Sequence, residues 1–445
     1  MSGDYTRNRT TSSGNRQPVK RNNAKYMTQQ DVRNKRPAQP SSKPKIRHTK
    51  PKKELSHAPA RKKFYFFGHD GNIDVGLFTV VIVLLVVGVI MMFSASYFWA
   101  LSEYNDGYYY LKRQLGFAVV GVALMAWIST FDYHFLQNTK IAYISFATVY
   151  VLNLITAFAG VEVAGARRWL VFFNLFSFQP SELLKIAFII VIAYILAANY
   201  PYFKKWKYTL LPFGIILGLV CFMMILQRHM SALLIFVILG TVLMYFGGIE
   251  NKHMAIILGI FAAGGILLLG YKMITSTGDS AGFGYISTRI EAWQHPESDI
   301  RNTTNQIWNS LLAIGSGGLM GVGLGESKQK FLWLSEAQND FVFAIVCEEL
   351  GFFGAVIVIA LFVVFIWRGI SVAAKAPDRF GMILSAGITI HIGLQALLNI
   401  AVATNTIPNT GISLPFFSYG GTALLMQLCE IGILLSVSRK TTHDE

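Results

Sequence analysis

The chain has 445 residues, of which 53% are hydrophobic and only 14% are charged, and yet it carries a formal net charge of +15. This charge is confined to one end: residues 1–63 hold 18 Lys and Arg against three acids, whereas the other 382 residues hold 21 bases and 21 acids. The division excludes a uniformly basic nucleic-acid-binding protein, so no nucleic acid is expected among the partners. A mean hydropathy of +0.45 indicates an integral membrane protein.

Residues 1–70 are polar, basic and rich in Pro, Ser, Asn and Gln, which predicts a disordered tail because almost nothing in them can be buried. The first apolar run begins near Val75 and is too long for a signal peptide, so we expect a membrane anchor there. Cys221, Cys347 and Cys429 all fall in apolar stretches. An odd number of such cysteines predicts packing residues and neither a disulfide framework nor a zinc site.

Ten apolar stretches follow the tail, and each has roughly the ~20 residues that a helix needs to cross a bilayer. They predict an all-α integral membrane protein of ten transmembrane helices, with a membrane domain over residues 71–438 and a large loop at about 272–339 between the seventh and eighth helices. The predicted crossings are 75–97, 115–131, 141–160, 183–199, 209–226, 231–248, 254–271, 340–367, 380–404 and 418–438.

An even number of crossings places both termini on one side of the membrane, and the distribution of basic residues predicts which side. Ten Lys and Arg lie in the short loops and C-terminal tail on the side of the N-terminus, against five in the opposite short loops. The positive-inside rule therefore predicts a multi-pass protein of the cytoplasmic membrane with cytoplasmic termini, including a C-terminal tail over residues 439–445. The 272–339 loop is then extracytoplasmic.

Ionisable residues inside apolar segments are expensive, at ~2.5 kcal/mol or more, so each needs a reason. Glu182 and Lys185 stand three apart on one face of the fourth helix, which favours either a self-neutralising pair or a Lys185 that meets an anion while Glu182 orients it. Ser181 is expected to cap this helix after Pro180. The helix N-terminus, Arg168 and Lys185 would then converge on a site suited to phosphate oxygens.

Three further groups of polar or special residues have structural interpretations. Glu348 and Glu349 point about 100° apart on a helix, so we expect at least one to pair with a buried cation. His391 is interpreted as a hydrogen-bonded packing histidine. The Gly-rich run from 315 to 325 lacks the Gly-Lys-Ser/Thr ending of a nucleotide loop, so it predicts close backbone packing or a flexible lid.

Several of these stretches together resemble the SEDS (shape, elongation, division and sporulation) family, the FtsW/RodA/SpoVE proteins of bacterial cell-wall synthesis. The longest match is residues 407–422, which read IPNTGISLPFFSYGGT. The other matches are SAS at 94–96, LKRQL at 111–115, RW at 168–169, FQPSELLK at 178–185, AIGSGGL at 313–319, and DFVFA with EELG at 340–351. The resemblance spans roughly residues 75–438, and it implies the ten-helix topology predicted above.

By resemblance, the activity is peptidoglycan glycosyltransfer from the membrane-bound precursor lipid II. The family's proposed catalytic acid falls on Asp299, sixteen residues before Gly315, and Glu297 is the reserve candidate. The sequence departs from the family pattern after Asp299, where residues 300–304 read IRNTT in place of a proline and glycines. Two other departures are His229, where the family often has an Asp, and LSEAQND at 334–340, which lacks the usual Pro, His and Thr.

Polymerisation needs a base that takes the proton of an attacking sugar hydroxyl, a role we assign to the carboxylate of Asp299. It also needs cations for the leaving pyrophosphate, which are expected to be Arg168 and Lys185 with Glu182 beside them, and also Arg113. One carboxylate without a nucleophile implies a single, inverting displacement. The expected supporting residues from the matched motifs are Glu336, Asp340, Glu349, Ser418 and Gly420.

No cofactor is evident and no metal ligand cluster is present in the sequence, although a divalent cation bridging pyrophosphate and acid is compatible with this chemistry. The resemblance implies lipid II as substrate and a class B penicillin-binding protein, a transpeptidase, as partner, within the membrane machinery of division or elongation. Two other functions stay open: a flippase or transporter of lipid-linked precursors, and a non-catalytic scaffold of the cell-wall synthesis complex.

Overall fold

A computed structural model describes residues 71–441 except 164–165, 173–175, 204, 251, 257–258, 260–283, 301 and 332, and all described residues belong to one unit, residues 62–445. The predicted tail, residues 1–70, lies outside the described residues, and so does almost all of the predicted seventh crossing at 254–271. Eight described helices are long and apolar enough to cross a membrane, and the shorter apolar helix α6 is a ninth candidate. They are α1 (Val75–Tyr104), α2 (Tyr109–Ile128), α3 (Thr139–Ala159), α4 (Pro180–Asn199), α5 (Trp206–Leu226), α6 (Met230–Phe246), α10 (Val342–Ala374), α11 (Arg379–Ala403) and α12 (Gly421–Ser438).

These nine helices correspond to nine of the ten predicted crossings. Most of their bounds differ from the prediction by a few residues, because hydropathy does not see the polar ends of a helix. The largest differences are in α1 and α10, which both continue seven residues beyond the predicted C-terminal limit. In the part of the chain that the structure describes, two further helices, α8 (Gly284–Gln294) and α9 (Asn305–Gly317), lie within the predicted 272–339 loop.

The expectation of an all-α protein is wrong in one place. Residues 161–178 form a small antiparallel sheet of three strands, β1 (Val161–Val163), β2 (Ala166–Phe172) and β3 (Phe176–Phe178), in the order β1-β2-β3. The segment is rich in Val, Phe and Trp, which favour extended backbone. Strands of three to seven residues are too short to stand out from the long apolar helices on either side.

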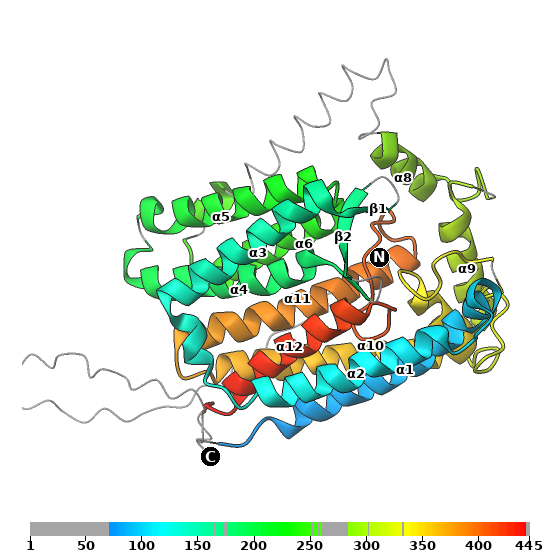
Figure 1. Ribbon diagram of the computed structural model, residues 1–445, viewed down its shortest axis with the longest axis horizontal. Helices are drawn as coiled ribbons and strands as arrows, with labels where there is room; N and C mark the ends of the chain where they lie inside the picture. Colours follow the sequence, from blue (N-terminus) through cyan, green and yellow to red (C-terminus); the bar gives the residue numbers. More distant parts are fainter. Residues whose placement is uncertain are drawn as a thin grey trace, which may run out of the picture. The chain divides into compact units, whose positions relative to one another are not determined.

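Helices α4 and α11 form the interior of the bundle, since 78% of the apolar stretch in each is buried. Helix α11 packs against α4, α6, α10 and α12, and α2 packs along α12 (Figure 1). His391 of α11 is buried and its Nδ1 lies 2.9 Å from the Glu430 carboxylate of α12. The interpretation of His391 as a hydrogen-bonded packing residue is therefore confirmed.

The first and last described segments lie side by side. The backbone N–H of Asp74, the residue that caps α1, donates to the Ser438 hydroxyl at the end of α12 over 3.1 Å. Asp74 also accepts a hydrogen bond from Leu77 N, which stabilises the start of α1. The start of α1 and the end of α12 are thus in direct contact.

The Gly-rich run packs its backbone directly on α10. Val322 N and Gly323 N donate to the carbonyls of Glu348 and Glu349, and Phe352 N donates to the Gly318 carbonyl over 2.9 Å. A Cβ atom on Gly321 would overlap the Glu349 carbonyl. Of the two interpretations of this run, close backbone packing is the one that the structure contains.

Candidate active site

The fourth helix begins at Pro180, two residues earlier than a Ser181 cap would imply. Pro180 is its first residue and Gln179 its N-cap, so the expectation that Ser181 caps the helix is wrong. Proline is well suited to the first helical position, where its missing N–H costs nothing and its φ is already helical. The Ser181 side chain is instead buried, and its hydroxyl has no hydrogen-bond partner among the described residues.

Glu182 and Lys185 form a buried ion pair on one face of α4. The Lys185 Nζ and Glu182 Oε2 atoms are 2.8 Å apart, and both side chains are less than a tenth exposed. A buried charge is tolerated only with such a partner, because an unpaired ammonium in an apolar core is very costly. The self-neutralising pair that the i,i+3 spacing favours is therefore present.

Arg168 and Lys185 act on the same imidazole from different elements. His229, which precedes α6, is buried, and its pKa lies well below the ordinary value because burial disfavours the imidazolium and the charges of Arg168 and Lys185 add to the effect. The Arg168 side chain, from β2, donates a hydrogen bond to the Arg228 carbonyl, which lies next to His229. The structure thus places a neutral histidine beside two cations, at a position where the family often has an aspartate.

Two buried side-chain amides hold the elements of this region together. The Asn153 side chain of α3 donates to the Pro180 carbonyl over 3.1 Å, and the Gln227 side chain donates to the Asn153 carbonyl over 2.8 Å. These bonds tie α3 and the turn before α6 to the first residue of α4. Our sequence analysis missed both amides, although an Asn in the middle of an apolar helix is itself a signal of a buried hydrogen bond.

Asp340 lies just before α10 and faces the segment after α11. A Cβ atom on Gly411, whose φ is +67°, would lie 3.3 Å from the Asp340 Oδ2 atom, so the carboxyl is close to the glycine backbone. The Asn399 side chain donates to both the Asp340 and Ile412 carbonyls over 2.7 Å, which fixes the two segments together. A side chain at this position would be strained by the positive φ and would contact the carboxyl tightly.

Burial raises the pKa of Asp340 to about 6, the nearby Glu336 carboxylate adds to the rise, and the charges of Arg289 and Arg168 oppose it. Arg168 is therefore common to the surroundings of His229 and of Asp340. Arg289, from α8, was not singled out from the sequence, because an arginine in a short polar helix carries no sign that it faces a buried acid.

Asp299 lies in the turn between α8 and α9. Its carboxylate accepts hydrogen bonds from Thr303 N at 3.1 Å, from the Thr303 hydroxyl at 3.0 Å and from the Asn302 side chain at 3.1 Å. These bonds, led by that from Thr303 N, lower the pKa of Asp299 below its usual value against a small opposing effect of burial. The residues that depart from the family pattern thus hold the carboxylate in its charged form.

The reserve candidate, Glu297, is exposed, and its carboxylate lies 3.8 Å from the ring of the equally exposed His295. Thr303, which hydrogen-bonds the Asp299 carboxylate, lines a small cavity together with Arg289.

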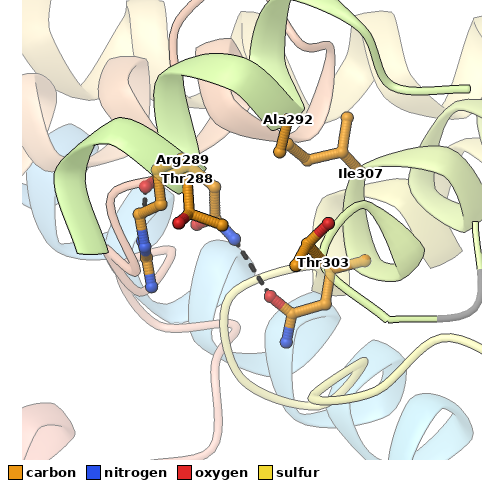
Figure 2. A pocket seen from close by; sticks show the side chains of 7 residues that line it. Thr288, Arg289, Ala292, Thr303 and Ile307 are labelled. Carbon is orange, nitrogen blue, oxygen red and sulfur yellow. Dashed lines mark hydrogen bonds between the residues drawn. The ribbon is translucent and has the colours of Figure 1, made fainter. Parts of the chain in front are cut away.

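This cavity, which we call the Arg289 cavity, has a volume of about 180 Å³ (Figure 2). Arg289 donates to the Asn409 carbonyl, and the Asn409 side chain donates to Gln306 Oε1 over 3.0 Å, so α8, α9 and the segment after α11 are tied around it. It is lined by Thr288, Arg289, Ala292, Thr303, Gln306, Ile307 and Asn409. A guanidinium and several hydroxyl and amide groups make it suited to an anionic or polar group.

Arg113 belongs to a different set of contacts. Its guanidinium lies 4.4 Å from the centre of the Tyr109 ring, and it also hydrogen-bonds Tyr419. The expected pyrophosphate site would need Arg113 close to Arg168 and Lys185. The contacts given above for Arg113 are instead with Tyr109 and Tyr419. A stacked guanidinium remains charged, but here it organises the tyrosines at the start of α2.

The other expected supporting residues hold the loops around Asp340. The Ser418 hydroxyl donates to the Asn339 carbonyl over 2.6 Å and accepts from Leu414 N over 2.7 Å. Gly420 N donates to the Gln114 side chain over 3.4 Å, and the Asn339 side chain donates to Glu336. Through these bonds the segment from 411 to 420 is fixed to the residues that precede α10.

Glu348 and Glu349 have separate partners, as their angular separation predicts. Glu349 lies 2.8 Å from Lys330 Nζ and accepts a 2.7 Å bond from the Ser94 hydroxyl of α1, with all three groups buried. Glu348 accepts from Ser327 and, over 2.9 Å, from Lys328 N. The expected buried cation is Lys330, so these two acids anchor the loop before α10. No cluster of three metal-ligating side chains occurs within the described ranges.

Comparison with known proteins identifies the family of this chain. A family model described as "Cell cycle protein", that of the FtsW, RodA and SpoVE proteins, matches residues 75–443. The chain belongs to the FtsW/RodA/SpoVE family. It is therefore a multi-pass membrane protein of a family that acts in cell-wall synthesis.

Curated relatives align over nearly their whole length. The probable peptidoglycan glycosyltransferase FtsW of Geobacter sp. (strain M18) is 36% identical over 82% of this chain and 97% of the relative. The stage V sporulation protein E of Bacillus subtilis is also 36% identical, over 83% of this chain and 98% of the relative. Relatives in the family to which this chain belongs are thus named as probable peptidoglycan glycosyltransferases.

Solved structures share the fold. The rod shape determining protein RodA of Thermus thermophilus is 25% identical, with a TM-score of 0.60 over 84% of this chain and 98% of its own. A chain from a peptidoglycan synthase complex that coordinates polymerisation and crosslinking has a TM-score of 0.66 at 23% identity, over 84% of this chain and 99% of its own. The second likeness supports the fold alone.

Proposed function

We propose that this protein is a peptidoglycan glycosyltransferase that polymerises lipid II into glycan strands at the outer face of the cytoplasmic membrane. The observation that carries the proposal is the placing of two cations around the buried His229. Arg168 of β2 donates to the Arg228 carbonyl next to it, Lys185 of α4 is held by Glu182, and the charges of both act on the imidazole. Cations fixed in a largely water-free site favour the charge that develops on a leaving pyrophosphate. The family membership supplies the reaction class.

In the proposed reaction, a sugar hydroxyl attacks the anomeric carbon of a chain held by a lipid pyrophosphate. The new glycosidic bond forms as the bond from the anomeric carbon to the phosphate oxygen breaks, and the electron pair of that bond leaves with the pyrophosphate. Asp299 takes the hydroxyl proton. Its hydrogen bonds to Thr303 and Asn302 keep it ionised and oriented for this role.

Lys185 and Arg168 have different roles in this scheme. Lys185 neutralises the pyrophosphate, and Glu182 holds its ammonium group in position at 2.8 Å. The charges of Arg168 and Arg289 both act on Asp340, so negative charge that arrives near this carboxyl meets fixed positive groups. A class B penicillin-binding protein would crosslink the strand as it leaves, which agrees with the synthase complex among the structural neighbours.

The test is polymerisation of labelled lipid II by the purified full chain with its cognate transpeptidase. We expect Asp299→Ala to reduce the rate by about 100-fold or more, in line with the loss of a general base. Glu297→Ala is the matched control, since it removes an exposed acid two residues away, and it should retain the wild-type rate. Full activity of Asp299→Ala would rule out the assignment, and a loss confined to Glu297→Ala would move the role to that residue.

The two other functions give different results. A scaffold would require that Asp299→Ala fully supports growth of a depletion strain that the deletion does not support. A flippase would translocate labelled lipid II across vesicles with Asp299 removed, because its essential charges would lie within the membrane. Both outcomes would contradict the proposal.

A further inference from the structure

A second, larger cavity lies on the other side of α9. It has a volume of about 640 Å³, and we call it the α9 groove. It is lined by Ile300, Asn305, Trp308, Asn309, Leu312, Lys328, Gln329 and Trp333. Half of these side chains are apolar, two of them are tryptophans, and the others are three amides and one ammonium group.

The walls of the α9 groove are fixed by buried hydrogen bonds. The Asn309 side chain donates to the Trp333 carbonyl over 2.9 Å and to the Asn305 carbonyl over 3.0 Å. The opposite wall is fixed where Lys328 N donates to the buried Glu348 carboxylate. Because the backbone is held in this way, the groove is formed before any ligand arrives, which lowers the entropy cost of binding.

The exposed groups of the groove suit a ligand with both flat apolar faces and negative charge. Trp333 is 66% exposed, and its ring offers a flat apolar face. Lys328 adds an ammonium group to the same lining. A hydrocarbon chain would leave this ammonium group unmatched, whereas an amino sugar with an acidic peptide branch matches both the aromatic face and the positive charge.

The α9 groove lies next to the proposed base, Asp299. Ile300, which directly follows Asp299, lines the α9 groove, and the Asn305 side chain holds the Ile300 carbonyl at 3.1 Å. Thr303, which holds the Asp299 carboxylate, lines the Arg289 cavity (Figure 2). Asp299 thus stands between a cavity with a guanidinium and a groove with aromatic rings.

A glycosyl transfer joins two sugar-bearing substrates, so it needs binding on both sides of the base. We propose that the α9 groove binds the sugar units of the growing glycan strand next to the reacting end. This inference rests on the proposed function and adds the place where the strand lies. The groove's role is to retain the strand between successive additions, which controls how many units are added before release.

The first test measures strand length. Trp333→Ala and Lys328→Ala, in the full chain with its cognate transpeptidase, should shorten the mean product several-fold on a gel. Trp367→Ala is the matched control, because this tryptophan of α10 is equally exposed at 64% and lies outside the groove. Unchanged strand length in an active Trp333→Ala enzyme would overturn the inference.

The second test measures binding without catalysis and separates this inference from the proposed function. Soluble disaccharide-peptide oligomers should quench the part of the tryptophan fluorescence that is lost in Trp333→Ala, with an affinity about tenfold weaker for Lys328→Ala. Brominated phospholipid should not quench this part. Quenching by brominated lipid but not by the oligomers would mean that Trp333 faces the membrane, and would overturn the inference whether or not the protein polymerises lipid II.

Discussion

Asp299 and Asp340 are both aspartates in loops, but their pKa values are shifted in opposite directions. Three hydrogen bonds lower the pKa of Asp299, whereas burial raises that of Asp340 to about 6. Asp299 is therefore ionised throughout the physiological range. Asp340 changes charge close to it, so it can respond to a substrate that brings or removes negative charge next to Arg168 and Arg289.

The raised pKa of Asp340 predicts a pH dependence of stability. Between the ordinary pKa near 3.8 and the folded value of about 6, the folded protein binds more protons than the unfolded chain, so the free energy of unfolding falls as the pH rises through this window. Asp340→Asn removes the effect. Its thermal midpoint in detergent should exceed that of the wild type by an amount that grows from pH 4 to pH 6.5 and is constant above.

The control for this measurement is Asp299→Asn, whose carboxyl group has a lowered pKa and is exposed. The difference between this variant and the wild type should not increase over the same window. A constant difference for Asp340→Asn, independent of pH, would show that Asp340 is ionised at its ordinary pKa.

Helix α10 is two helical pieces that meet at a glycine. Gly351 has φ +67° and ψ −167°, which breaks the helical path between the acids Glu348 and Glu349 and the longer apolar part. The Gly-rich run fits into this break, with its backbone in hydrogen-bonding contact with α10. The loop that contains the proposed base is thereby joined to a membrane helix through main-chain atoms, without the flexibility of side chains.

This packing predicts that glycines within the run differ sharply in their tolerance of substitution. Gly321→Ala should lower the free energy of unfolding by about 3 kcal/mol, because the residue has φ +80° and its Cβ would overlap the Glu349 carbonyl. Gly315→Ala should be neutral or stabilising by up to about 1 kcal/mol, since it lies inside α9 with open space around it.

Thermal unfolding of the purified full chain, followed by a thiol-reactive or intrinsic fluorescence probe, compares the two variants. Equal midpoints for Gly321→Ala and Gly315→Ala would mean that the run behaves as a loose lid. Polymerisation measured at a temperature where both variants are folded would then show whether the same contact also positions Asp299.

For the molecule as a whole, hydropathy predicted nine of the described apolar helices, eight of them long enough to cross a membrane, because a bilayer imposes a length and an apolar composition that few other structures share. The Glu182–Lys185 pair was predictable for a similar reason, since i,i+3 residues share a helix face whatever surrounds them. The partner of Glu349 was not, because Lys330 lies 19 residues away across an irregular loop. The contact of Arg289 with the Asn409 carbonyl likewise joins residues far apart in the sequence, which no local pattern encodes.

The division of charge along the chain leads to a last prediction at this scale. Residues 1–63 carry all of the net charge of +15, and the remaining residues are balanced, so the cations proposed to act on the substrate are each matched by an acid or a backbone carbonyl within the bundle. With cytoplasmic termini, the basic tail would lie across the membrane from Asp299. It could act on orientation, on anionic lipid headgroups or on a cytoplasmic partner, but not on the sugars of lipid II.

Deletion of residues 2–60 should therefore leave in vitro polymerisation within about twofold of the wild-type rate, because no charge of the proposed site is removed and screening over more than a Debye length of ~10 Å leaves little long-range effect. Protease protection of a C-terminal tag in inverted vesicles checks that insertion is unchanged. A strong loss of polymerisation by a correctly inserted deletion variant would show that the charge of the tail contributes to the reaction. Neutralising the 18 bases in groups would then locate the ones responsible.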